Sequence, residues 1–122
     1  MLRRSAWLLC VLVLCASCQK FAEGRVVFRE LLTLRDEIAT EFKEKVVDVN
    51  IANGDRLTVK FVNSPVASRT AGEKQQRADE VAAFVVKHYK HPLASVTTMF
   101  VSRGGNLSTG ESYVGRPGSS GP

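Results

Sequence analysis

Histidines and paired carboxylates are the residues of this chain whose chemistry could support catalysis. The two histidines, His88 and His91, are three residues apart at the end of a predicted helix. A catalytic zinc site needs three protein ligands and a structural site needs four, and the sequence places no third ligand beside this pair. We therefore expect two surface histidines, whose positive charge would suit the C-terminal end of a helix dipole.

Two pairs of adjacent acidic residues, Asp36-Glu37 and Asp79-Glu80, fall on predicted solvated helix surface. Two carboxylates that share acid–base work must converge on a pocket with separated pKa values, and nothing in the sequence indicates convergence. No GxSxG nucleophile elbow is present. The sequence predicts no catalytic residue, no metal site and no cofactor. The alternative is a small envelope hydrolase that uses His88.

The first 18 residues, MLRRSAWLLCVLVLCASC, have the three parts of a secretory signal. Arg3 and Arg4 form a positive start, residues 5–17 form an apolar centre that ends in small residues, and Cys18 follows. The apolar run is shorter than the about 20 residues that span a bilayer core. We expect an exported protein whose signal peptide occupies residues 1–17.

Residues 14–18, LCASC, resemble the lipobox of bacterial lipoproteins, in which a lipid-modified cysteine becomes the new N-terminus. Ala16, Ser17 and Cys18 match the motif, whereas Cys15 stands where the family usually has leucine. The resemblance implies a lipid anchor (palmitate among its acyl chains) at Cys18 and a tether over residues 18–24. Gln19 in place of aspartate implies the periplasmic side of the outer membrane. The alternatives are simple cleavage, which releases a soluble secreted domain, and an uncleaved anchor.

The body of the chain after the signal peptide carries neither a thiol nor a strong charge. All three cysteines lie within residues 1–18, which excludes a disulfide, a cysteine nucleophile and a thiolate zinc site from residues 19–122. The net charge of +5 falls to +3 once Arg3 and Arg4 are removed. A nucleic-acid-binding domain needs clustered basic residues, so we expect no nucleic-acid partner.

Hydrophobic residues at helical spacing predict two helices, one over about residues 25–43 and one over about residues 71–90. Thr70 and Glu73 have the spacing of a capping box at the start of the second helix. The predicted buried stripes are Val27, Leu31, Leu34, Ile38 and Phe42 in the first helix, and Ala78, Val81, Ala82, Val85 and Tyr89 in the second.

Alternating apolar residues predict three strands. Residues 47–51 and 57–61 flank Asn53-Gly54, which is typical of a type I′ hairpin turn. Residues 96–102 form the third strand. Residues 103–122 are rich in glycine, serine and proline and are predicted to be a disordered tail, with Ser112–Val114 as a brief edge strand at most.

These elements predict a single small α+β domain over residues 25–102 with the order α-β-β-α-β. We expect a three-stranded, mostly antiparallel sheet of order 2-1-3, with the third strand antiparallel to the first and both helices on one face. The order is similar to that of the BON domain of bacterial envelope proteins, although the glycine-punctuated hairpin of that family is missing. A resemblance in topology does not carry function.

The sheet face away from the helices is the surface on which we expect a partner, because apolar residues gathered on an open face can mark a contact site. Its predicted residues are Lys60, Val62, Met99 and Val101. The sequence therefore predicts a lipid-anchored envelope protein with a non-catalytic binding or structural role, which contacts the membrane through Cys18 and binds an envelope protein through this face. The sequence does not determine the oligomeric state.

Overall fold

The computed structural model describes residues 27–118. The predicted signal peptide, the lipidation site Cys18 and the tether lie outside these residues. The chain divides into two compact units, residues 1–30 and 31–122. Of the first unit only residues 27–30 are described, and they are helical. The second unit carries the sheet and the sites discussed below.

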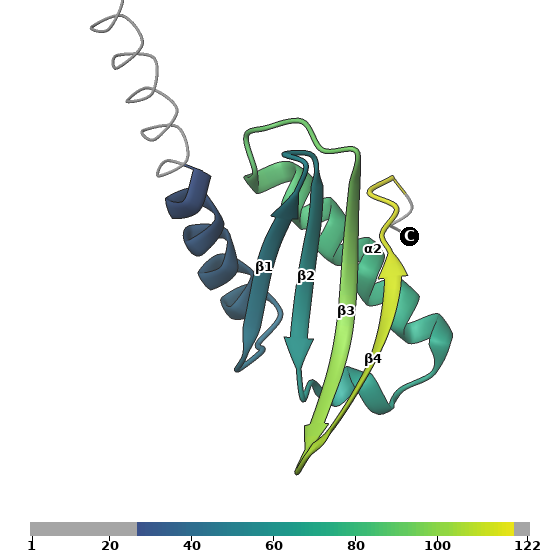
Figure 1. The fold of residues 1–122 in the computed structure, drawn as a ribbon. Helices are drawn as coiled ribbons and strands as arrows, with labels where there is room; N and C mark the ends of the chain where they lie inside the picture. Colours follow the sequence, from purple (N-terminus) through teal and green to yellow (C-terminus); the bar gives the residue numbers. More distant parts are fainter. Residues whose placement is uncertain (1–26, 119–122) are drawn as a thin grey trace, which may run out of the picture. The chain divides into compact units, whose positions relative to one another are not determined.

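The second unit is an α+β fold with a four-stranded mixed sheet (Figure 1). The helix that is described from residue 27 ends at residue 41. The remaining elements are β1 (Val47–Ala52), β2 (Arg56–Val62), the 3-10 helix η1 (Pro65–Ser68), α2 (Ala71–His88), β3 (Ser95–Gly104) and β4 (Leu107–Val114). The α+β class predicted from the sequence is confirmed.

The predicted strand order 2-1-3 is wrong, since the strands lie in the order β1-β2-β3-β4. β1 and β2 form the predicted antiparallel hairpin, but β3 pairs in parallel with β2 and not antiparallel with β1. The physical reason for the observed order is that β2 and β3 bury apolar side chains on both of their faces. Val62 and Val101 place apolar side chains on the second face of β2 and β3 and are both buried, whereas the same face of β1 carries exposed Asp48 and Asn50. Central positions therefore suit β2 and β3, and β1 forms an edge.

The prediction of a disordered tail is wrong over residues 103–114. β4 pairs antiparallel with β3 along its whole length, from Gly104 opposite Leu107 to Thr97 opposite Val114. Gly105, with φ of 62°, occupies the two-residue turn between the strands. β4 lacks an apolar alternation because it is an exposed edge strand, and only Tyr113 is partly buried.

The core lies between the helices and one face of the sheet. In-register pairing aligns Val49 with Val59 and Phe61 with Phe100, so that apolar residues form rows across the strands. Phe61 is fully buried, and its ring lies 6.3 Å from that of Phe42 and 5.9 Å from that of Phe100. Both helices contribute to the same buried cluster, through Leu34, Ile38, Val81, Ala82 and Val85.

Two local sequence signals act as predicted. Asn53 and Gly54 both have positive φ (55° and 75°), as a type I′ turn requires, and the Asp55 N–H donates to the Ala52 carbonyl at 3.3 Å, which closes the turn. The Thr70 hydroxyl accepts a hydrogen bond from the Glu73 N–H at 3.2 Å and caps α2.

Candidate functional site

The four residues predicted to form a partner surface lie together on the sheet face opposite the core. Parallel pairing places Lys60 beside Met99 and Val62 beside Val101. The predicted order 2-1-3 places the first strand between Lys60 and Val62 on one side and Met99 and Val101 on the other. In the structure β2 and β3 are neighbours, so the four residues are directly adjacent. Val62 and Val101 form a buried floor at 9% and 6% exposure, whereas Lys60 and Met99 are half-buried.

Val46 extends this apolar floor at the β1 edge. It lies one residue before β1, its carbonyl accepts the Val62 N–H at 3.1 Å, and its side chain is 51% exposed. Together Val46, Val62, Val101 and Met99 form a strip across the sheet, which we call the apolar strip. Sequence reasoning missed Val46, although its alternation with Val47 was the signal that could have placed it on this face.

Basic side chains border the apolar strip. Arg56, Lys60 and Arg103 alternate onto the same face as Met99. Among the described residues, none of the three forms an ion pair, although Asp48 lies opposite Lys60 in the adjacent strand. By contrast, Lys74 and Arg77 on the helical side of the sheet are paired with carboxylates. The open face therefore offers cations that are free to meet an acidic partner.

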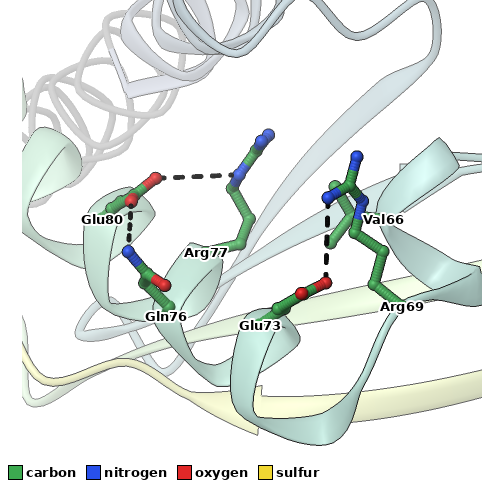
Figure 2. A pocket seen from close by; sticks show the side chains of 6 residues that line it. All are labelled: Val66, Arg69, Glu73, Gln76, Arg77 and Glu80. Atoms are coloured by element: carbon green, nitrogen blue, oxygen red, sulfur yellow. Dashed lines mark hydrogen bonds and ion pairs between the residues drawn. The ribbon is translucent and has the colours of Figure 1, made fainter.

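A shallow pocket of about 340 Å³ lies on the helical side, at the junction of η1 and α2 (Figure 2). Arg69 lies 3.8 Å from Glu73, and Arg77 lies 3.8 Å from Glu80. The pocket therefore carries alternating charges that neutralise one another and offers no excess charge of one sign to a ligand. It is lined by Val66, Arg69, Glu73, Gln76, Arg77 and Glu80.

Behind this pocket, Arg77 fastens α2 to the loop after the first helix. Its Nη1 lies 3.9 Å from the carboxylate of Glu44, a side chain only 5% exposed, and its guanidinium lies 5.1 Å from the centre of the Phe42 ring. Ser64 donates a hydrogen bond of 2.5 Å to the same carboxylate and accepts one from the Val66 N–H. The buried Arg77 Nη1 makes no hydrogen bond to a described residue, so its contact with Glu44 is an ion pair only. The cluster joins α2 to the loop after the first helix and has a structural explanation.

A second polar cluster joins α2 to β4. Lys74 donates a hydrogen bond to Glu111, and the Tyr113 hydroxyl donates to the same carboxylate oxygen at 2.9 Å. The Lys74 hydrogen bond is the largest cause that lowers the pKa of Glu111, and the Glu111 carboxylate in turn raises the pKa of Lys74 and of Tyr113. Lys74, Glu111 and Tyr113 thus stabilise each other's ordinary protonation states and join α2 to β4, and we call these three residues the clamp.

Asp79 corrects one expectation from the sequence. The pair Asp79-Glu80 was predicted to lie on solvated surface, but Asp79 is buried, and it accepts hydrogen bonds from the Gln75 amide at 3.0 Å and the Arg116 N–H at 2.9 Å. It fixes the segment after β4 on α2. No local pattern signals this contact, because it joins residues 37 positions apart.

His88 does not lie in a recognisable catalytic arrangement. Its ring stacks on Phe84 at 4.1 Å, and its Nδ1 lies 3.4 Å from a Glu37 oxygen on the first helix. His91 lies apart from it, with its ring 5.2 Å from that of Tyr89. Within residues 27–118 no three histidine, cysteine or acidic side chains are close enough to hold a metal ion. The contacts of His88 are those of a side chain that packs α2 on the first helix.

In the part of the chain that the structure describes, no helix is both long and apolar enough to cross a membrane. Comparison of the chain with protein-family models, with curated proteins and with solved structures finds no match.

Proposed function

We propose that this protein is a lipid-anchored envelope protein with a non-catalytic binding role, and that its partner contacts the open sheet face. The observation that carries the proposal is the adjacency of Lys60 to Met99 and of Val62 to Val101, which joins the four residues into one surface. A strip of apolar residues with a charged border is the usual anatomy of a protein–protein contact.

The distribution of polar groups supports binding rather than catalysis. On the helical side, the carboxylates of Glu44, Asp79 and Glu111 are engaged by Ser64, Arg116 and Lys74, and so hold elements of the fold together. The open face instead presents cations that no described carboxylate engages. A soluble secreted domain of the same fold is the alternative, and a small envelope hydrolase using His88 is the second.

The anchor is tested by the substitution Cys18→Ser in cells supplied with labelled palmitate. We expect the wild type to incorporate the label and to fractionate with membranes, and the variant to do neither. Cys10→Ser, which removes a thiol upstream of the proposed cleavage site, is the matched control and should behave as the wild type. A wild-type protein that takes up no label and fractionates as soluble would support the secreted alternative.

The binding face is tested by Met99→Glu, with cross-linking in intact cells followed by purification of the cross-linked product. We expect the variant to lose most of the product while its melting temperature stays close to that of the wild type, because Met99 lies outside the core cluster. Val86→Glu on α2, where the side chain is 53% exposed, is the control and should retain the product. Equal cross-linking by the two variants would contradict the proposed face.

A further inference from the structure

The outer edge of β4 is long and lacks most of the features that protect edge strands. Among residues 27–118 the sheet ends at β4, and no described strand lies beyond it (Figure 1). Natural edge strands are commonly protected by proline, lysine or a bulge. The sequence LSTGESYV has neither proline nor lysine, and its register with β3 runs without interruption. The only charged residue, Glu111, points to the helical side, where Lys74 binds it.

The register identifies the backbone groups that point away from the sheet. Gly115 N–H donates to the Val96 carbonyl at 2.8 Å, so the odd-numbered residues of β4 face β3 in hydrogen-bonded pairs. The N–H and C=O groups of Ser108, Gly110 and Ser112 consequently point outward. The edge ends at Val114, whose carbonyl already accepts a hydrogen bond from the Gln75 side chain at 2.8 Å.

Gly110 leaves a gap in this strand that the fold itself does not require. Its φ is outside the left-handed region, and an added Cβ would lie at ordinary contact distances, 3.7 Å from Val101 Cγ2 and 3.8 Å from Met99 Cε. The absence of a side chain therefore opens the end of the apolar strip to the β4 edge. Glycine in a strand interior often marks close approach of a ligand or another backbone, and a large side chain on a neighbouring strand can cover such a glycine.

A cation lies two residues from this gap along the sheet. Arg103 is opposite Ser108 on the open face, and no described carboxylate pairs with it. A strand added beside β4 would place one side chain next to Gly110 and the side chain two residues away next to Ser108. The position next to Gly110 suits a large apolar side chain. The position next to Ser108 suits an acidic side chain, because the long Arg103 side chain can extend across the small Ser108 to reach it.

We propose that β4 binds an extended segment of the partner protein as a fifth strand, and that Gly110 and Arg103 determine its specificity. The segment would hydrogen-bond to Ser108, Gly110 and Ser112 and place a large apolar residue over Gly110 against Met99 and Val101. An acidic residue two positions away would meet Arg103. Strand addition of this kind draws affinity from main-chain bonds and specificity from alternate side chains. The inference rests on the proposed function and names the partner's chemistry.

A second copy of this chain fits the edge less well than such a segment. On the open face, the central part of another β4 would present Ser108, Gly110 and Ser112, which include neither a large apolar nor an acidic side chain. Two copies paired through this edge would leave the gap at Gly110 unfilled and Arg103 without an acid. The occupant that the edge complements is therefore a different polypeptide.

The test is selection of phage-displayed random dodecapeptides on the full-length chain in detergent micelles. Enriched peptides are expected to share a large apolar residue with aspartate or glutamate two positions away. Synthesised and labelled, they should bind the wild type at least tenfold more tightly than Gly110→Val, and Arg103→Ala should weaken binding of the acidic peptides. Gly104→Val is the control, because a Cβ at residue 104 meets nothing within 4 Å, and it should bind within twofold of the wild type.

Hydrogen exchange shows whether the peptide occupies the edge or only the face. Bound peptide should slow exchange of the Ser108, Gly110 and Ser112 amides. Gly110→Ala provides a milder variant if Gly110→Val lowers the melting temperature, and it should weaken binding without unfolding the domain. No enrichment, equal binding to Gly110→Val and the wild type when both are folded, or unchanged exchange in β4 would overturn the inference.

The failure of this inference is distinguishable from failure of the proposed function. If Met99→Glu abolishes cross-linking to the partner while Gly110→Val preserves it, the partner binds the face and the strand-addition inference is wrong. If both variants cross-link as the wild type does, the proposed face is wrong as well. Cross-linking of the chain to itself that is lost in Gly110→Val would identify a second copy as the occupant and overturn the inference.

Discussion

Gly115 packs so closely on Ala82 that a Cβ added to residue 115 would lie 2.5 Å from the Ala82 Cβ. It would also lie 2.5 Å from the Ala78 carbonyl oxygen, so both obstacles belong to α2. This contact, together with the hydrogen bond from Arg116 to Asp79, explains why the chain remains ordered beyond β4. A glycine in a Gly/Ser/Pro-rich stretch is here a packing requirement.

Gly115→Ala should therefore destabilise the domain, although alanine is ordinarily tolerated at exposed chain ends. Overpacking of this kind costs about 1 to 3 kcal/mol, which thermal or urea denaturation measures directly. Gly118→Ala is the matched control, because a Cβ at residue 118 has nothing within 4 Å. Equal stabilities of the two variants would mean that the segment after β4 does not pack on α2.

Phe61→Ala should be the most damaging single truncation in β2. Phe61 is fully buried between the rings of Phe42 and Phe100, and deletion of a buried aromatic side chain costs about 3 to 5 kcal/mol. Because small domains have only about 5 to 15 kcal/mol of stability in total, the variant should be largely unfolded near its working temperature. Thr58→Ala, on the opposite face of the same strand, should change the melting temperature little.

The clamp between α2 and β4 should make stability fall in acid. The pKa of Glu111 is lower in the folded chain than in the unfolded chain because Lys74 and Tyr113 donate hydrogen bonds to its carboxylate. A group with a lowered folded pKa contributes stability above its unfolded pKa, about 4.3 for glutamate, and loses that contribution as the pH falls through the folded value. The melting temperature should accordingly decrease below about pH 4 to 5.

Glu111→Gln isolates this contribution. The variant should have a lower melting temperature than the wild type at pH 7 and a smaller decrease between pH 6 and pH 3. Asp48→Asn is the control, since Asp48 is exposed and forms no ion pair with another described residue. If Asp48→Asn flattened the acid dependence as much as Glu111→Gln, the clamp would not be its source.

The elements that local patterns specify could be predicted from the sequence. Asn53-Gly54 predicted its turn because few residues other than glycine and asparagine tolerate positive φ at both central positions. Thr70 and Glu73 predicted the start of α2, since a cap depends only on neighbours within one turn.

The arrangement of the strands could not be predicted in the same way, because pairing joins residues far apart in the chain. Val62 and Val101 were interpreted only as residues of a partner surface, although apolar side chains on both faces of a strand also indicate a central position in the sheet. β4 was missed because an exposed edge needs no apolar alternation. Its one signal was Gly105-Asn106 between two extended runs, a dipeptide typical of hairpin turns. The contact of Asp79 with Arg116 had no sequence signal at all.

The agreement between strand order and chain order has a consequence for how the molecule folds. β1 with β2, and β3 with β4, are each joined by a short turn, so both hairpins can form from neighbouring residues. Only the parallel join of β2 to β3 must wait until η1 and α2 close a loop of more than 30 residues, from Val62 to Ser95. We expect that late closure to limit the folding rate, since non-local pairing carries the largest loop entropy. Until the join forms, the two halves of the sheet are separate hairpins with exposed edges.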